Sequence, residues 1–98
     1  MVARTRDELL SIGREAVDHV AGTCILKAAE VAVGADSTDL PAYFFDFAVD
    51  FDRYRRPDFP VHARIMQRTW DALTERGDEH IPYITVFSQA DWEKHRRA

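Results

Sequence analysis

The sequence predicts a small α+β domain whose elements follow the order helix, strand, strand, helix, strand and short helix. Three observations predict this fold class. Residues 5–20 and 60–76 repeat apolar side chains at the spacing of amphipathic helices. Residues 43–51 alternate between two kinds of side chain, as a strand requires. A chain of 98 residues suits one domain, residues 1–98, with a mixed three-stranded sheet and helices packed on its apolar face.

The first helix is predicted from its start signal and its apolar stripe. Thr5 and Glu8 have the spacing of a capping box, and Gly22 marks the end of the helix. Between these signals, apolar or small residues recur every three or four positions on one face: Leu9, Ile12, Gly13, Ala16, Val17 and Val20.

Residues 23–34 are predicted as a strand, because Gly22 and Gly34 bracket them and a turn-rich run, residues 36–41, follows. A helix stays open as an alternative, since residues 27–30 consist of helix-favouring types. In the strand reading, the side chains expected to face the core are Ile25, Ala29, Val31 and Val33.

Residues 43–51 give the clearest strand signal in the chain. One parity carries an apolar, mostly aromatic wall and therefore predicts the buried face: Tyr43, Phe45, Phe47, Val49 and Phe51. The other parity contains two carboxylates and predicts an acidic face: Phe44, Asp46, Ala48 and Asp50.

After a proline-containing loop over residues 53–60, a second long helix is predicted from Pro60 to a C-cap at Gly77. Arg68 and Asp71 are three apart on its polar side, a spacing that favours a pair. Its apolar side comprises Val61, Ile65, Met66, Thr69, Trp70 and Leu73.

The chain ends with a predicted buried strand and a short helix. Residues 81–87 are almost entirely apolar, and Pro82 suits the beginning of a strand. Ser88 and Asp91 resemble a capping box, so a helix that contains Trp92 is expected to follow.

The strongest candidate site is a carboxylate cluster on the acidic face. If residues 23–34 pair with residues 43–51, Glu30 points to the same side as Asp46 and Asp50, and Asp52 continues that side. Carboxylate oxygens are the ligands that magnesium prefers, so these four residues are a candidate Mg²⁺ site. The alternative is a structural face that is either solvated or neutralised by Arg53, Arg55 or Arg56.

Other candidates are less specific. The local cluster Asp78-Glu79-His80 lies in a predicted turn, where it could bind a metal or move protons. The single cysteine, Cys24, excludes an internal disulfide and is expected to be buried as a small apolar residue. The run Arg53-Tyr54-Arg55-Arg56 could contact nucleic acid, with the tyrosine stacking on a base.

Charge and composition narrow the partners. Residues 21–52 hold one lysine and six carboxylates, which indicates cationic partners and makes nucleic acid an unlikely main partner. No secretory signal and no apolar run long enough for a membrane span is visible, so the cytoplasm is the expected compartment.

The element order and the final third resemble the minimal nucleotidyltransferase domain. The resemblance rests on residues 68–73, RTWDAL, then 81–88, IPYITVFS, and 91–93, DWE. That family places a Gly-Ser pair after its first strand and an Asp-x-Asp on its second. Here the matching positions hold Gly34-Ala35 and, at the strand's end, Asp50-Phe51-Asp52. The resemblance therefore implies the family's fold in a degenerate, non-catalytic relative.

These observations favour a small interaction or regulatory module, an accessory or antitoxin-like subunit that binds a protein partner or forms a homo-oligomer. The alternative is a metal-dependent nucleotidyl or phosphoryl transfer enzyme that uses the carboxylate cluster with Mg²⁺. A nucleic-acid-contacting domain is the third hypothesis.

Overall fold

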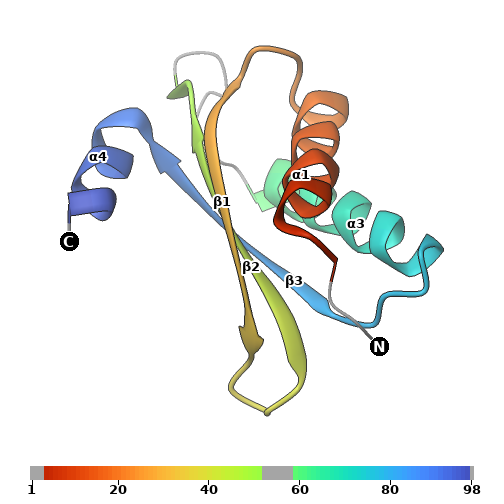
Figure 1. Ribbon diagram of the computed structural model, residues 1–98. Coiled ribbons are helices and arrows are strands. Elements are labelled where there is room, and N and C mark those ends of the chain that lie inside the picture. Colours follow the sequence, from red (N-terminus) through yellow and green to blue (C-terminus); the bar gives the residue numbers. More distant parts are fainter. Residues whose placement is uncertain (1–3, 52–58, 98) are drawn as a thin grey trace.

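The predicted α+β fold is confirmed by the computed structural model, which describes residues 4–51 and 59–97 (Figure 1). No helix within these ranges is long and apolar enough to cross a membrane. The elements are α1 (Arg6–Val20), β1 (Leu26–Ala35), β2 (Pro41–Val49), α3 (Phe59–Glu75), β3 (Ile81–Ser88) and α4 (Gln89–Arg97).

The three strands form one mixed sheet in the order β1-β2-β3. β1 and β2 form an antiparallel hairpin, and β3 returns through α3 to pair with β2 in parallel. The helices α1 and α3 lie together on one side of the sheet, which we call the inner face (Figure 1). The opposite side, the outer face, carries α4 at the end where β2 and β3 finish.

The central strand β2 supplies most of the core. Tyr43, Phe45 and Phe47 point to the inner face and are completely buried beneath the two helices. The alternation read from the sequence is therefore confirmed, and it places Phe44 and Asp46 on the outer face.

The helix α1 approaches the sheet closely at Gly13. A Cβ atom at this position would lie 2.8 Å from Cζ of Phe47 and 3.3 Å from Cδ1 of Phe45. The missing side chain of Gly13 lets the helix rest directly on the rings of Phe45 and Phe47.

The start of α1 is as predicted, because the Thr5 hydroxyl accepts a hydrogen bond from the amide of Glu8.

The end of α3 explains how the chain enters β3. Gly77 has φ 73°, and its amide donates to the carbonyl of Thr74. The amide of Asp78 donates to the carbonyl of Leu73, which completes a Schellman motif. This C-cap is the one predicted from the sequence, and it directs Asp78 back towards the core.

Several predictions near the hairpin are wrong. β2 ends at Val49, so Asp50 and Phe51 lie beyond the strand. Cys24 is exposed rather than buried, because it lies in the turn before β1 with φ 66°. Val33 is 54% exposed, because the tip of the hairpin extends past the helices and the core does not reach it (Figure 1). The helical alternative for this segment is excluded by the β1–β2 pairing.

Two predictions for α3 are also wrong. Trp70 is 39% exposed, whereas the neighbouring Thr69 is buried as predicted, with its hydroxyl donating to the carbonyl of Ile65. Arg68 pairs with Glu15 of α1, at 2.6 Å, and not with Asp71. Asp71 accepts a hydrogen bond from Gln67, one turn earlier. The rest of the apolar side holds at Ile65, Thr69 and Leu73, which are buried as predicted.

Replacing Gly13 by alanine should destabilise the protein despite alanine's higher helix propensity. The added methyl group would meet buried rings that have little room to move, and overpacking of this kind costs about 1–3 kcal/mol. The gain in propensity is only about 1 kcal/mol. Urea unfolding would measure the difference, with Ser11→Ala on the exposed side of the same helix as the control. A Gly13→Ala variant more stable than the parent would contradict the close approach.

Candidate functional site

The carboxylates Glu30 and Asp46 lie on the outer face, as the sequence predicts. They are direct partners in the β1–β2 register, so their like charges would repel. Each has a basic side chain beside it. Arg6 Nη2 lies 2.9 Å from Oε2 of Glu30, and His95 Nε2 lies 3.3 Å from Oδ2 of Asp46. Side chains from two different helices therefore accompany these two carboxylates.

The remaining members of the predicted cluster are placed differently. Asp50 follows the end of β2, where its amide donates to the carbonyl of Ile25. Asp52 lies outside the described residues, as does the Arg53–Arg56 run considered for nucleic acid. In the part of the chain that the structure describes, no three His, Cys, Asp or Glu side chains gather as metal ligands. A Mg²⁺ site that includes Asp52 stays a prediction.

The outer face also carries an aromatic pair. Phe44 of β2 and Tyr83 of β3 are register partners, and their rings stack at a centroid distance of 5.6 Å with an interplanar angle of 16°. They are 36% and 37% exposed. Ala32 of β1 is the next residue in the same row across the sheet. We call this row and the hairpin tip beside it, residues 36–40, the open half of the outer face.

Tyr83 is held in place by the loop between β1 and β2. Its hydroxyl donates to Oδ2 of Asp36 at 2.8 Å. The other carboxylate oxygen accepts from the Thr38 hydroxyl and from the amides of Thr38 and Leu40. These donors, the Thr38 hydroxyl first and the Tyr83 hydroxyl second, lower the pKa of Asp36 to about 2. The ionised Asp36 thus joins the loop to the aromatic pair.

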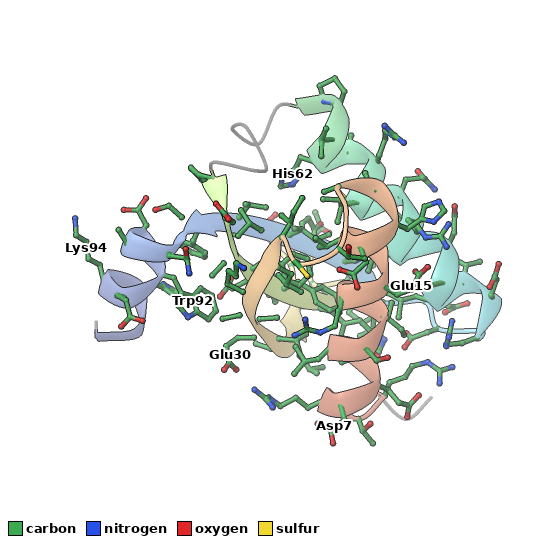
Figure 2. All side chains as sticks on the ribbon, turned by 90° about the horizontal axis from the view of Figure 1, so that it is seen from above. Asp7, Glu15, Glu30, His62, Trp92 and Lys94 are labelled. Atoms are coloured by element: carbon green, nitrogen blue, oxygen red, sulfur yellow. The ribbon has the colours of Figure 1, made fainter. Side chains whose placement is uncertain are left out.

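The helix α4 covers only the other end of the outer face. Trp92 is 4% exposed and meets Phe87 edge to face at 5.7 Å. The His95 ring stacks on the same phenylalanine at 4.7 Å. Glu30 and Trp92 lie on the same side of the sheet (Figure 2). Among the described residues, no helix extends over Phe44 and Tyr83, so the open half remains in contact with solvent.

The cluster Asp78-Glu79-His80 proposed from sequence is partly formed. Asp78 is buried, and Oδ1 lies 2.6 Å from Nδ1 of His80. The hydroxyl of Tyr43 donates to Oδ2 of Asp78 at 2.6 Å, and the tyrosine ring stacks on His80 at 4.2 Å. Glu79 is exposed and stands apart. The cluster joins the start of β2 to the turn that precedes β3.

Burial and hydrogen bonds act in opposite directions on Asp78. Burial raises its pKa, but hydrogen bonds from Tyr43 and from the amide and ring of His80 outweigh it, so the pKa lies below the ordinary aspartate value. Burial, followed by the bond to this carboxylate, raises the pKa of Tyr43. Arg4 adds a partial countercharge, with Nε 3.7 Å from Oδ2 of Asp78. An ionised aspartate is thereby held in the interior.

A polar groove of about 620 Å³ separates α1 from α3. Glu15 and Arg68 bridge it, with Nη2 of the arginine 2.6 Å from Oε1 and Nε 3.1 Å from Oε2 of the glutamate. The hydrogen bond from Arg68 lowers the pKa of Glu15. Since the bridging charges neutralise each other, the groove presents no single sign of charge to a ligand.

The sequence did contain a signal for the aromatic pair. Phe44 is the one ring in the outer parity of residues 43–51, where the other members are small or acidic. Tyr83 gave no such signal, because residues 81–87 are apolar in both parities and do not distinguish the faces. The partnership of the two rings depends on the parallel register of β2 and β3.

Comparison with known proteins gives no relative. No protein family matches the chain, and no curated protein or solved structure matches it significantly. The resemblance to the nucleotidyltransferase domain therefore stays a prediction.

Replacing Tyr43 by phenylalanine should cost about 1–3 kcal/mol at pH 7, because Asp78 loses a buried donor. The wild-type carboxylate has a lowered pKa when folded, so its contribution is present above the unfolded pKa of about 3.9 and disappears as the pH falls through the folded value. The difference in the free energy of unfolding between the wild type and the variant should therefore become smaller in acid. Urea unfolding at pH 7 and again in acid tests this, with Ser11→Ala at an exposed position of α1 as the control. A difference in the free energy of unfolding that grows in acid would contradict a hydrogen bond from Tyr43 to an ionised Asp78.

Asp36 should remain ionised down to about pH 2, because Thr38 and Tyr83 donate to its carboxylate. Carboxyl carbon shifts in an NMR titration would report this directly. Tyr83→Phe should raise the pKa of Asp36 while leaving the Thr38 bonds intact. An unchanged titration in that variant would show that the tyrosine hydroxyl does not bind the carboxylate in solution.

Proposed function

We propose that this chain is a small protein-interaction module that binds a partner through the open half of the outer face. The observation that carries the proposal is the stacked Phe44–Tyr83 pair, which stands on a sheet face beyond the reach of α4. Aromatic side chains of this kind are enriched at interfaces, because they offer a large contact area at a small cost in side-chain entropy.

Further exposed apolar side chains lie near the hairpin tip. Val33 is on the other side of β1 near the tip, and Leu40, which precedes β2, is 49% exposed. Single exposed apolar residues are normal on a protein surface, whereas a contiguous group indicates an interaction site. Phe44 and Tyr83 form such a contiguous pair through their register and ring stacking, and the exposed Leu40 directly precedes β2, the strand that carries Phe44.

A hydrogen bond also orients one ring of the aromatic pair before any partner binds. Asp36 fixes the Tyr83 hydroxyl, and the same carboxylate is fixed by three donors in its own loop. A pre-organised surface loses less conformational entropy on binding than a mobile one. These bonds support a binding role more than they support the stability of the fold, because they lie at the surface.

Site-specific photocrosslinking in cells tests the proposal. A photoreactive phenylalanine analogue at position 44 should give covalent adducts, because the proposed partner covers that ring. The same analogue at position 70 is the matched control, since Trp70 is exposed to a similar degree but lies on α3, across the sheet. Adducts are detected by a shift in mass and identified by mass spectrometry. Equal labelling at both positions, or none at 44, would reject the open half as a binding surface.

A further inference from the structure

The two ends of the outer face differ in shape and charge. At one end α4 stands on the sheet, and its C-terminal end lies away from the strands (Figure 1). At the other end the hairpin tip projects beyond the helices (Figure 1). The α4 end of the outer face is therefore raised, and the hairpin end is open. A molecule that fills the open half must project towards it, because no helix of this chain described by the structure covers that half.

The hairpin tip is acidic and α4 ends in basic residues. Asp39 is exposed at the tip. The carboxylate of Asp36, in the same loop, already accepts hydrogen bonds from Thr38, Leu40 and Tyr83. Residues 94–97 of α4 are Lys-His-Arg-Arg, while the acids of that helix, Asp91 and Glu93, come earlier. Lys94 is exposed and points away from its own sheet (Figure 2). The two ends are thus complementary in charge.

We propose that the partner of the open half is a second copy of this chain. The two outer faces meet about a two-fold axis that lies between the sheets, perpendicular to the strands. This axis reverses the strand direction, so that α4 of each copy covers the hairpin tip of the other. The inference rests on the proposed function and names its partner.

In this arrangement, a lysine of α4 meets the aromatic pair and the acidic hairpin tip of the second copy. The aliphatic stem of Lys94 can cover the Phe44 and Tyr83 rings while its ammonium group lies close to Asp39 of the second copy. Because a two-fold interface is isologous, every contact occurs twice and the assembly closes at two chains. The open half of each copy is covered in the same step.

Light scattering after gel filtration at about 0.1 mM chain tests the proposal, since a small interface of this kind is expected to dissociate in the micromolar range. The wild-type protein should elute as a dimer. Phe44→Ser combined with Tyr83→Ser should raise the dissociation constant by about 100-fold, since each lost ring accounts for about tenfold. Trp70→Ser is the matched control and should leave the dimer unchanged. Circular dichroism verifies that every variant is folded.

Charge reversal tests the head-to-tail arrangement separately. Lys94→Glu should raise the dissociation constant by about three- to tenfold, because the contact occurs at two places in the dimer. Adding Asp39→Lys to the same chain reverses both charges and should restore the wild-type dimer within about threefold. A dimer that the single variant leaves intact, or that the double variant fails to restore, overturns this arrangement.

The outcomes separate the two proposals. A wild-type chain that stays monomeric at about 0.1 mM overturns self-association. If position 44 then still gives adducts with a different protein and position 70 does not, the interaction surface stands and only the identity of the partner is wrong. Adducts with twice the mass of the chain support both proposals, and a monomer without adducts at position 44 overturns both.

Discussion

The structure depends on the burial of three rings on one side of the central strand. Tyr43, Phe45 and Phe47 lie beneath α1 and α3, and each buried aromatic side chain contributes about 2–3 kcal/mol of hydrophobic stabilisation. A shift of β2 by one residue would turn all three into solvent, so the register is strongly fixed. The position of every side chain on the outer face follows from this constraint, including Phe44 and Asp46.

The same constraint places two carboxylates opposite each other, and side chains from two helices lie beside them. Once the register is fixed, Glu30 and Asp46 must face each other on the outer side. Arg6 comes from the helix layer of the inner face, and His95 comes from α4, so basic side chains reach the two carboxylates from opposite sides of the sheet. Because these pairs are exposed, they add little to stability, and their effect is mainly to orient α1 and α4 against the strands.

Features that depend on local chemistry could be predicted from the sequence. The alternation in β2, the Thr5 cap and the glycine C-cap at Gly77 are each determined within a few residues, and each is confirmed. The exposed Cys24 was missed because the reading rested on the apolar neighbours that follow it, whereas a positive φ turns this residue outward. A local pattern gives no information about the backbone conformation in an irregular turn.

Contacts between residues that are far apart in the sequence could not be predicted from local patterns. The Tyr43–Asp78 bond joins residues 35 positions apart, and the Arg6–Glu30 pair joins α1 to β1 around the sheet edge. The side of the sheet on which α4 packs was equally undetermined, because its one buried side chain among residues 89–95, Trp92, could have packed on either face. Only the parity of Phe87 in β3, which depends on the register with β2, assigns α4 to the outer face.

The docking of α4 and the openness of the outer face are linked energetically. Among the described residues, the indole Nε1–H of Trp92 is buried without an acceptor, and such a group costs about 1–3 kcal/mol. The edge-to-face contact with Phe87 and the burial of the indole ring offset this cost. A partner that covers Phe44 and Tyr83 would also lie against α4, and would therefore stabilise its docked position by mass action. Binding at the open half and the order of the C-terminal helix should consequently rise and fall together.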